Sequence, residues 1–129
     1  MTAGKSCELT RSVTEGMTAA ALGSGSLPVF GTPCLIALME EAACACLAGE
    51  LPEGRTSVGV KLDVSHVSPT PVGMAVTARA EITGVSANGK LIDFRVTAHD
   101  EAGLIGEGTH QRAVVAADRF LEKCRAKRG

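Results

Sequence analysis

Aromatic side chains are almost absent from this chain of 129 residues, which contains no tryptophan, no tyrosine and only 3 phenylalanines. Proteins that bind single-stranded nucleic acid stack its bases on exposed aromatic rings, so this function is not expected. An excess of charge of one sign is also lacking, because the formal net charge is −1 and acidic and basic residues are interspersed. This balance argues against nucleic acid or a charged membrane surface as the main partner.

Long apolar runs and paired cysteine motifs are missing as well. No apolar run reaches the length of a membrane span, and the first residues, MTAGKSCELTRSV, lack the apolar segment of a secretory signal. The 5 cysteines are odd in number, and Cys44 and Cys46 form CxC rather than CxxC. Small buried thiols in a reducing compartment are therefore expected, which predicts a cytoplasmic protein.

The clearest positive feature is the stretch GTPCLIALMEEAACACLAG, residues 31–49, which predicts one long apolar helix. Thr32 is a suitable N-cap, and Pro33 suits the first helical position. Gly49 is a plausible end of the helix.

Four strand-like segments follow this helix, and the first three alternate between apolar and polar residues, as the strands of a half-buried sheet do. Asn88-Gly89 between two of them predicts a hairpin turn. Residues 1–13 are expected to be a tail that leads into a first strand, and residues 116–129 a short terminal helix. The strand-like segments are 57–66, 74–85, 91–99 and 104–115, and the last of them does not alternate clearly.

One strand, a long helix and at least four antiparallel strands predict an α+β fold. The helix is rich in alanine and cysteine, so a sheet can wrap closely around it, and Gly106 and Gly108 permit either strong curvature or close approach of the helix. We therefore predict the hot-dog fold, a curved antiparallel sheet wrapped around a long central helix, as a single domain over residues 1–129. Open sheet edges predict a homodimer or a dimer of dimers.

Two adjacent glutamates interrupt the apolar helix. Glu41 points away from the expected apolar face and is interpreted as a solvated or interface charge. Glu40 lies at the edge of that face, where a partly desolvated carboxylate needs a partner. Glu40 is either a functional group or a rim charge that is hydrogen-bonded to backbone or water. We expect replacement of its carboxylate to change the stability of the protein little. The expected apolar face comprises Leu35, Ile36, Met39, Ala43, Cys46 and Leu47.

Among the three histidines, His66 is the strongest candidate for a function. It ends segment 57–66 on the apolar face, where a lone histidine needs a partner, although a purely structural histidine is the alternative. His99 falls on the polar face of its strand. His110 is a weaker candidate that shares a face with Gly106 and Gly108. In segment 57–66 the apolar face is expected to hold Val58, Val60, Leu62 and Val64, and the opposite face Gly59, Lys61, Asp63 and Ser65.

Three stretches together resemble the fluoroacetyl-CoA thioesterase family of single hot-dog thioesterases: VFGTPCLIALMEEAA, VGVKLDVSHVSPTPVG and FRVTAHDEAGLIGEGTHQRAVV. The resemblance covers roughly residues 28–120. It implies an acyl-CoA thioesterase that works as a homodimer with active sites at the subunit interface. It implies acyl-CoA as the substrate and no metal or redox cofactor.

The resemblance also implies a set of site residues. A catalytic threonine at the helix start, a glutamate two turns later and a histidine after the next strand correspond to Thr32, Glu40 and His66. Gly59 corresponds to a glycine that lines the acyl site, and Arg112 to an arginine near the active site.

Thioester hydrolysis needs a nucleophile, proton transfer and a donor to the developing oxyanion. Either Thr32 or Glu40 is the nucleophile, or Glu40 is a base for water, and His66 moves protons. The structural alternatives are a plain helix cap for Thr32 and a tight strand–helix contact for Gly59. Arg112 forms a structural salt bridge, or it contacts a CoA phosphate or the catalytic carboxylate.

The segment before Thr32 departs from the fluoroacetyl-specific enzyme, which carries an extra aromatic lid there. Here the segment is LGSGSLPVFG, and Phe30 is its sole aromatic residue and a candidate substrate contact. We therefore expect small acyl groups to be accepted without strong discrimination for fluorine. Two rival functions are a hot-dog enoyl-CoA hydratase or dehydratase and a non-catalytic acyl-CoA-binding dimer.

Overall fold

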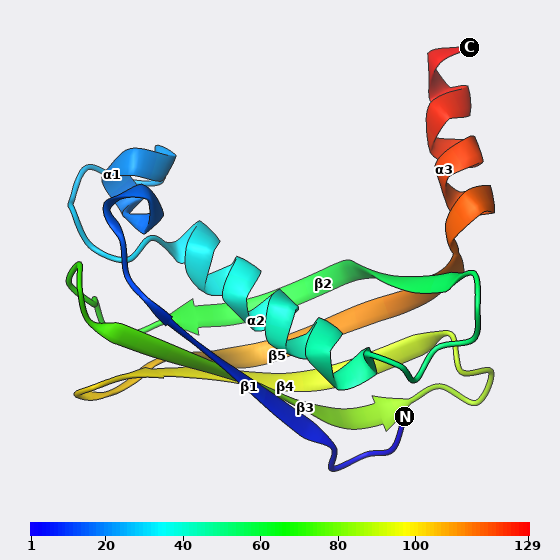
Figure 1. Cartoon of the computed structure of the whole chain (residues 1–129), viewed down its shortest axis with the longest axis horizontal. Helices are drawn as coiled ribbons and strands as arrows, with labels where there is room; N and C mark the ends of the chain where they lie inside the picture. Colours follow the sequence, from blue (N-terminus) through cyan, green and yellow to red (C-terminus); the bar gives the residue numbers. More distant parts are fainter.

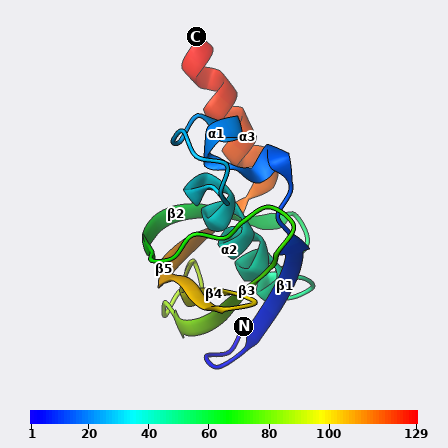
Figure 2. The ribbon, with the colours of Figure 1, turned by 90° about the vertical axis from the view of Figure 1, so that its left-hand side faces the viewer.

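A five-stranded antiparallel sheet curves around one long helix in the computed structural model, which describes residues 1–129 (Figures 1 and 2). The strand order is β1-β3-β4-β5-β2, so β1 and β2 form the two edges of the sheet. The predicted α+β hot-dog fold is confirmed. In chain order the elements are β1 (Ser6–Ser12), η1 (Glu15–Met17), α1 (Ala19–Leu22), α2 (Thr32–Leu47), β2 (Arg55–His66), β3 (Ala75–Val85), β4 (Leu91–Asp100), β5 (Gly103–Ala116), α3 (Ala117–Arg125) and η2 (Ala126–Arg128).

Helix α2 lies in the hollow of the sheet and supplies much of the hydrophobic core (Figure 2). Most of its predicted apolar face is buried, but Leu38 and Ala42 are buried too, and Ile36 is only half-buried. The buried surface of α2 is therefore wider than one stripe, because the curved sheet reaches both flanks of the helix. Its buried residues are Leu35, Leu38, Met39, Ala42, Ala43, Cys46 and Leu47.

Small side chains on the inner face of the sheet allow the helix to come close. Alternate residues of β3 and β4 are fully buried, and alanine recurs among them at positions 78, 80 and 98. In β5, a Cβ added to Gly106 would lie 2.9 Å from Leu35 Cδ2 of α2, which is too close for an unstrained contact. The predicted role of this glycine in helix approach is confirmed.

The start of α2 differs from the prediction. Gly31 is the N-cap, Thr32 is the first helical residue, and its hydroxyl makes no capping bond. The Thr32 hydroxyl instead faces the sheet, as described below. At the other end, Gly49 with φ 74° follows the C-cap residue Ala48, close to the predicted end. The first strand, β1, lies inside the segment predicted as a tail.

A β-bulge in β2 overturns part of the predicted strand alternation. In the pairing with β5, Gly59 lies opposite Arg112 and Lys61 opposite Gln111, so Val60 is an extra residue. On the N-terminal side of this extra residue, the side chains that face the helix are therefore the ones predicted to face away from it. Gly59 therefore faces α2, contrary to prediction, and Val60 is 52% exposed.

Helix α3 begins directly where β5 ends and stands away from the sheet (Figure 1). Its Phe120 and Leu121 are 44% and 45% exposed. None of the helices combines the length and apolar character needed to cross a membrane.

Candidate active site

The first turn of α2 and the end of β2 bring together two of the predicted catalytic residues. The hydroxyl oxygen Oγ1 of Thr32 lies 2.7 Å from Nδ1 of His66, a short hydrogen bond. Phe30 presents its ring edge-on to the His66 ring, with centroids 6.4 Å apart. These three residues line a hollow of about 280 Å³ between α1, α2 and the segment after β2. Thr32 is exposed and can be reached by a ligand, whereas Phe30 is 3% exposed.

His66 is held as a neutral base. Burial lowers its pKa below the usual value, and the backbone of Ser68 opposes this only in part. Its second ring nitrogen, Nε2, is buried and has no hydrogen-bond partner. If Nε2 carries the ring hydrogen, Nδ1 is free to accept the proton of the Thr32 hydroxyl. This arrangement is that of a hydroxyl nucleophile beside its base.

Glu40 belongs to a second cluster, further along α2. Its Oε2 accepts a hydrogen bond of 3.1 Å from Nη1 of Arg112 in β5. The Arg112 side chain is only 7% exposed, whereas that of Glu40 is 36% exposed. Ser57 holds the other side of the guanidinium, accepting from Nε with its hydroxyl at 2.8 Å and from Nη2 with its carbonyl at 3.1 Å. The carboxylate thus faces an immobilised positive charge at the rim of the core.

His110 completes this second cluster and is fixed in one tautomer. Its Nδ1 donates to the carbonyl of Lys61 at 2.8 Å, so Nε2 is left as an acceptor for Arg112 Nη1 at 3.1 Å. Burial lowers the pKa of His110, the Arg112 charge lowers it further, and the Lys61 carbonyl opposes the shift. The ring also stacks on Phe94. A neutral His110 therefore positions the arginine that faces Glu40.

Gly59 leaves the space in which the Glu40 carboxylate lies. A Cβ at this position would collide with Glu40 Oε2 and would also touch His110 and Arg112. Gly59 thus borders the Glu40 carboxylate, and its part in lining an acyl site stays a prediction. Sequence alternation placed it on the wrong face, because the bulge at Val60 leaves no mark in the residue pattern.

The structure thus brings the predicted residues together in two groups rather than one. Thr32 and His66 form the first, and Glu40, Gly59 and Arg112 form the second. Thr32 and Glu40 are eight positions apart on α2, which separates them by about 12 Å along the helix axis. Two members of the second group, Ser57 and His110, were not predicted as site residues. The shared face of His110 with Gly106 and Gly108 was the one sequence signal for it.

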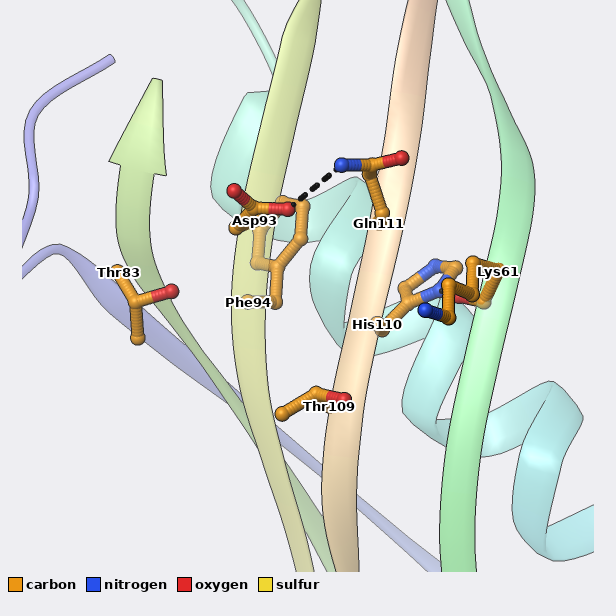
Figure 3. A pocket seen from close by; sticks show the side chains of 7 residues that line it. All are labelled: Lys61, Thr83, Asp93, Phe94, Thr109, His110 and Gln111. Carbon is orange, nitrogen blue, oxygen red and sulfur yellow. Dashed lines mark hydrogen bonds between the residues drawn. The ribbon is translucent and has the colours of Figure 1, made fainter. Parts of the chain in front are cut away.

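Glu41, by contrast, lies outside both groups. It is exposed and accepts a hydrogen bond of 2.6 Å from Arg11, as expected for a surface charge. The outer face of the sheet carries a separate polar hollow of about 310 Å³, in which Gln111 donates to Asp93 across β5 and β4 (Figure 3). Helix α2 lies behind the strands in that view, and His110, which lines this hollow, also reaches the cluster around Glu40, with its Nε2 3.9 Å from Glu40 Oε2. No group of three or more His, Cys, Asp and Glu side chains is placed to hold a metal ion.

Known proteins resemble this chain over both groups of site residues. The sequence model of a family described as fluoroacetyl-CoA-specific thioesterase matches residues 13–118. The fluoroacetyl-CoA thioesterase of Streptantibioticus cattleyicolor is 40% identical over 99 residues, covering 77% of this chain and 70% of that enzyme. A solved structure of the fluoroacetyl-CoA thioesterase FlK superposes with a TM-score of 0.92 at 34% identity, covering 98% of this chain and 97% of that one. A hot-dog-like protein from Thermanaerovibrio acidaminovorans gives a TM-score of 0.89 at 26% identity, covering 98% and 93%.

Proposed function

Because the chain belongs to the fluoroacetyl-CoA-specific thioesterase family, we propose that it hydrolyses a small acyl-CoA thioester to the free acid and CoA. The observation that carries this proposal is the 2.7 Å contact between the Thr32 hydroxyl and Nδ1 of a half-buried, neutral His66. The pair borders a hollow of about 280 Å³, which suits a small acyl group rather than a long chain.

Thr32 is the nucleophile in this proposal and His66 its base. The Thr32 oxygen attacks the thioester carbonyl carbon, and its proton passes to Nδ1 of His66. The C–S bond then breaks, and the CoA thiolate leaves with that proton. Water attacks the resulting acyl-threonine ester, giving the carboxylic acid and restoring the hydroxyl. The positive end of α2 stabilises the developing oxyanion, although Pro33 contributes no amide hydrogen.

Glu40 completes the constellation from the partner subunit of a homodimer. Edge strand β2 is 12 residues long and exposes Val60 at 52%, and Val67, which directly follows the strand, is 56% exposed; this apolar edge favours pairing with another strand. Antiparallel pairing of two β2 strands around a two-fold axis puts the His66 end of one opposite the Gly59 end of the other. The carboxylate and Gly59 amide of one subunit would then approach Thr32 of its partner. Glu40 there activates the attacking water, and the amide adds an oxyanion donor.

Mixing two inactive variants tests the shared site. When Glu40→Gln and His66→Ala subunits pair at random, half of the dimers contain one subunit of each kind. Each such mixed dimer holds one intact shared site and one inactive site. About a quarter of the wild-type activity should therefore return. Co-expression without any recovery would mean that each site is built from a single chain, or that the protein is a monomer. Light scattering distinguishes these two outcomes.

Release of free thiol from a panel of short-chain acyl-CoA thioesters tests the reaction itself. Hydrolysis releases thiol, whereas an enoyl-CoA hydratase or dehydratase leaves the thioester intact and a binding protein turns nothing over. Rapid quenching followed by intact-mass and peptide analysis then locates the acyl group. An acyl group on Glu40 instead of Thr32 would overturn the assigned nucleophile but not the reaction.

A further inference from the structure

A basic hollow of about 350 Å³ is lined by residues from the junction of β5 and α3, and none of the predicted catalytic residues lines it. Figure 1 shows α3 leaving the sheet at this junction. Four cationic side chains line it. Arg55 comes from the start of β2, Lys90 from the β3–β4 hairpin, and Arg119 and Lys123 from consecutive turns of α3. The remaining lining residues are Val114, Val115, Ala116 and Phe120.

The charge of this hollow is uncompensated. None of its four cations forms a salt bridge, although other arginines and lysines of the chain do. No acidic residue lines the hollow, and the α3 acids Asp118 and Glu122 lie outside it. Like charges that converge without counter-ions repel one another and concentrate anions from solution. The chain as a whole is nearly neutral, so the positive charge is a local property of this surface.

An aromatic ring stands beside the cations. Phe120 is 44% exposed and lines the hollow together with three small apolar residues of β5. A ring of this kind offers a stacking face for a base, while the cations bind phosphates. The combination fits a nucleotide that carries several phosphates better than it fits a free inorganic anion.

We propose that this hollow binds the phosphorylated adenosine end of a CoA thioester, an inference that rests on the proposed function. The distance is suitable. Arg112, which contacts Glu40, is four residues before Ala116 on β5, a separation of about 13 Å along the strand. The pantetheine chain between sulfur and phosphate has about twelve bonds, as many as four extended residues, and also spans roughly 13 Å. Val114, which packs against the core beside the hollow, shares the inner strand face with Arg112.

Two thioester substrates, one with the nucleotide and one without it, distinguish an effect on this hollow from an effect on the catalytic groups. The variant Arg119→Gln/Lys123→Gln keeps good helix formers on α3 and removes two of the four charges. We expect kcat/KM for an acyl-CoA to fall about tenfold or more, mainly through KM, which corresponds to about 1.4 kcal/mol per tenfold step. The loss should be confined to substrates that carry the nucleotide, so the acyl N-acetylcysteamine thioester should show none. The KM of the wild type for acyl-CoA should also rise with salt more steeply than that of the variant.

The variant Lys127→Gln/Arg128→Gln is the matched control, because it removes the same charge from residues outside the hollow. It should leave kcat/KM for acyl-CoA within about twofold of wild type. An equal loss in both double variants would mean that only the overall charge matters. An equal loss on both substrates would mean a structural effect of α3, and either result overturns the nucleotide site. If the wild type hydrolyses neither thioester but binds adenosine 3′,5′-bisphosphate through Arg119 and Lys123, the site stands and the proposed function fails.

Discussion

Replacing Glu40 with glutamine removes a charge while preserving the shape of the side chain. Glu40 Oε2 lies 3.1 Å from Nη1 of Arg112, whose side chain is 7% exposed. Glutamine keeps an oxygen that can accept this hydrogen bond but cannot act as a base. We expect kcat to fall about a hundredfold or more, as is typical for the loss of an acid–base group.

The same change should lower stability, and here the structure alters the expectation from the sequence. A hydrogen bond between charged partners contributes about 1.5–3 kcal/mol. Because Glu40 is 36% exposed and glutamine still accepts a bond, we expect a loss of about 1–2 kcal/mol. For a chain of this length the Tm should fall by about 3–8 °C. The sequence suggested little or no loss, because it did not reveal a buried guanidinium that depends on this carboxylate.

The neighbouring glutamate provides the control. Glu41→Gln makes the same chemical change one residue away, where the partner Arg11 and Glu41 itself are 46% and 53% exposed. Such surface pairs contribute little, so kcat and stability should stay within about 0.5 kcal/mol of wild type. The measurements are thiol release from an acyl-CoA substrate and a thermal melt for each variant.

A double variant tests whether Arg112 is the reason for the stability loss. Adding Arg112→Gln to Glu40→Gln should cost less than the sum of the two single changes, because neither variant side chain leaves a buried charge unpaired. Strictly additive losses would refute the coupling between the two residues. Loss of turnover in Glu41→Gln with normal turnover in Glu40→Gln would refute the assigned site altogether.

Four further outcomes are expected. Burial lowers the pKa of His66, and the neutral ring is the base. We therefore expect kcat/KM to rise with pH through an inflection below about 6.5, the ordinary pKa of histidine, and an inflection above about 7 would contradict this. Stability should fall as the pH drops below about 6.5, since the unfolded chain takes up protons that buried histidines resist. Gly59→Ala should reduce kcat at least about tenfold, because the added Cβ displaces Glu40. Gly84→Ala should not, because a Cβ there lies 3.8 Å from the nearest neighbouring atom. Equal kinetics of the two variants would show that the close approach of Gly59 to Glu40 is unimportant. The ratio of kcat/KM between fluoroacetyl-CoA and acetyl-CoA should stay below about a thousandfold, and a larger ratio would show that selectivity needs no aromatic lid.

Local patterns were sufficient to predict α2 and β2 to β5, but they did not place β1 or the short helices before α2. The apolar stretch at 31–49 became α2, the four strand-like segments became β2 to β5, and Asn88-Gly89 became a hairpin turn. These predictions succeed because side-chain periodicity reports which faces are buried, and burial of those faces is the main driving force of folding. Helix phase and strand alternation made Glu40 and His66 candidates, and the catalytic roles of Thr32, Glu40 and His66 came from resemblance, which carries over residue identities but not the distances between atoms.

Register and long-range pairing were decided by the tertiary structure alone. The bulge at Val60 turns Gly59 toward α2, and no local preference marks it, because an extra residue is defined only against the partner strand. The pairing of β2 with β5 then brings Ser57 to Arg112, 55 positions further along the chain. The same packing places Arg112 and the neutral His110 beside Glu40.

The residue types needed for acid–base chemistry, and the elements that carry them, were therefore determined by the sequence itself. Only the folded chain determined which carboxylate lies beside a buried cation. It also determined which imidazole lies beside a hydroxyl and which imidazole stays neutral. The physical reason is that hydrogen bonds and ion pairs depend on separations of a few ångströms and on the exclusion of water. Both conditions arise between residues that are distant in sequence, when α2 packs into the curve of the sheet.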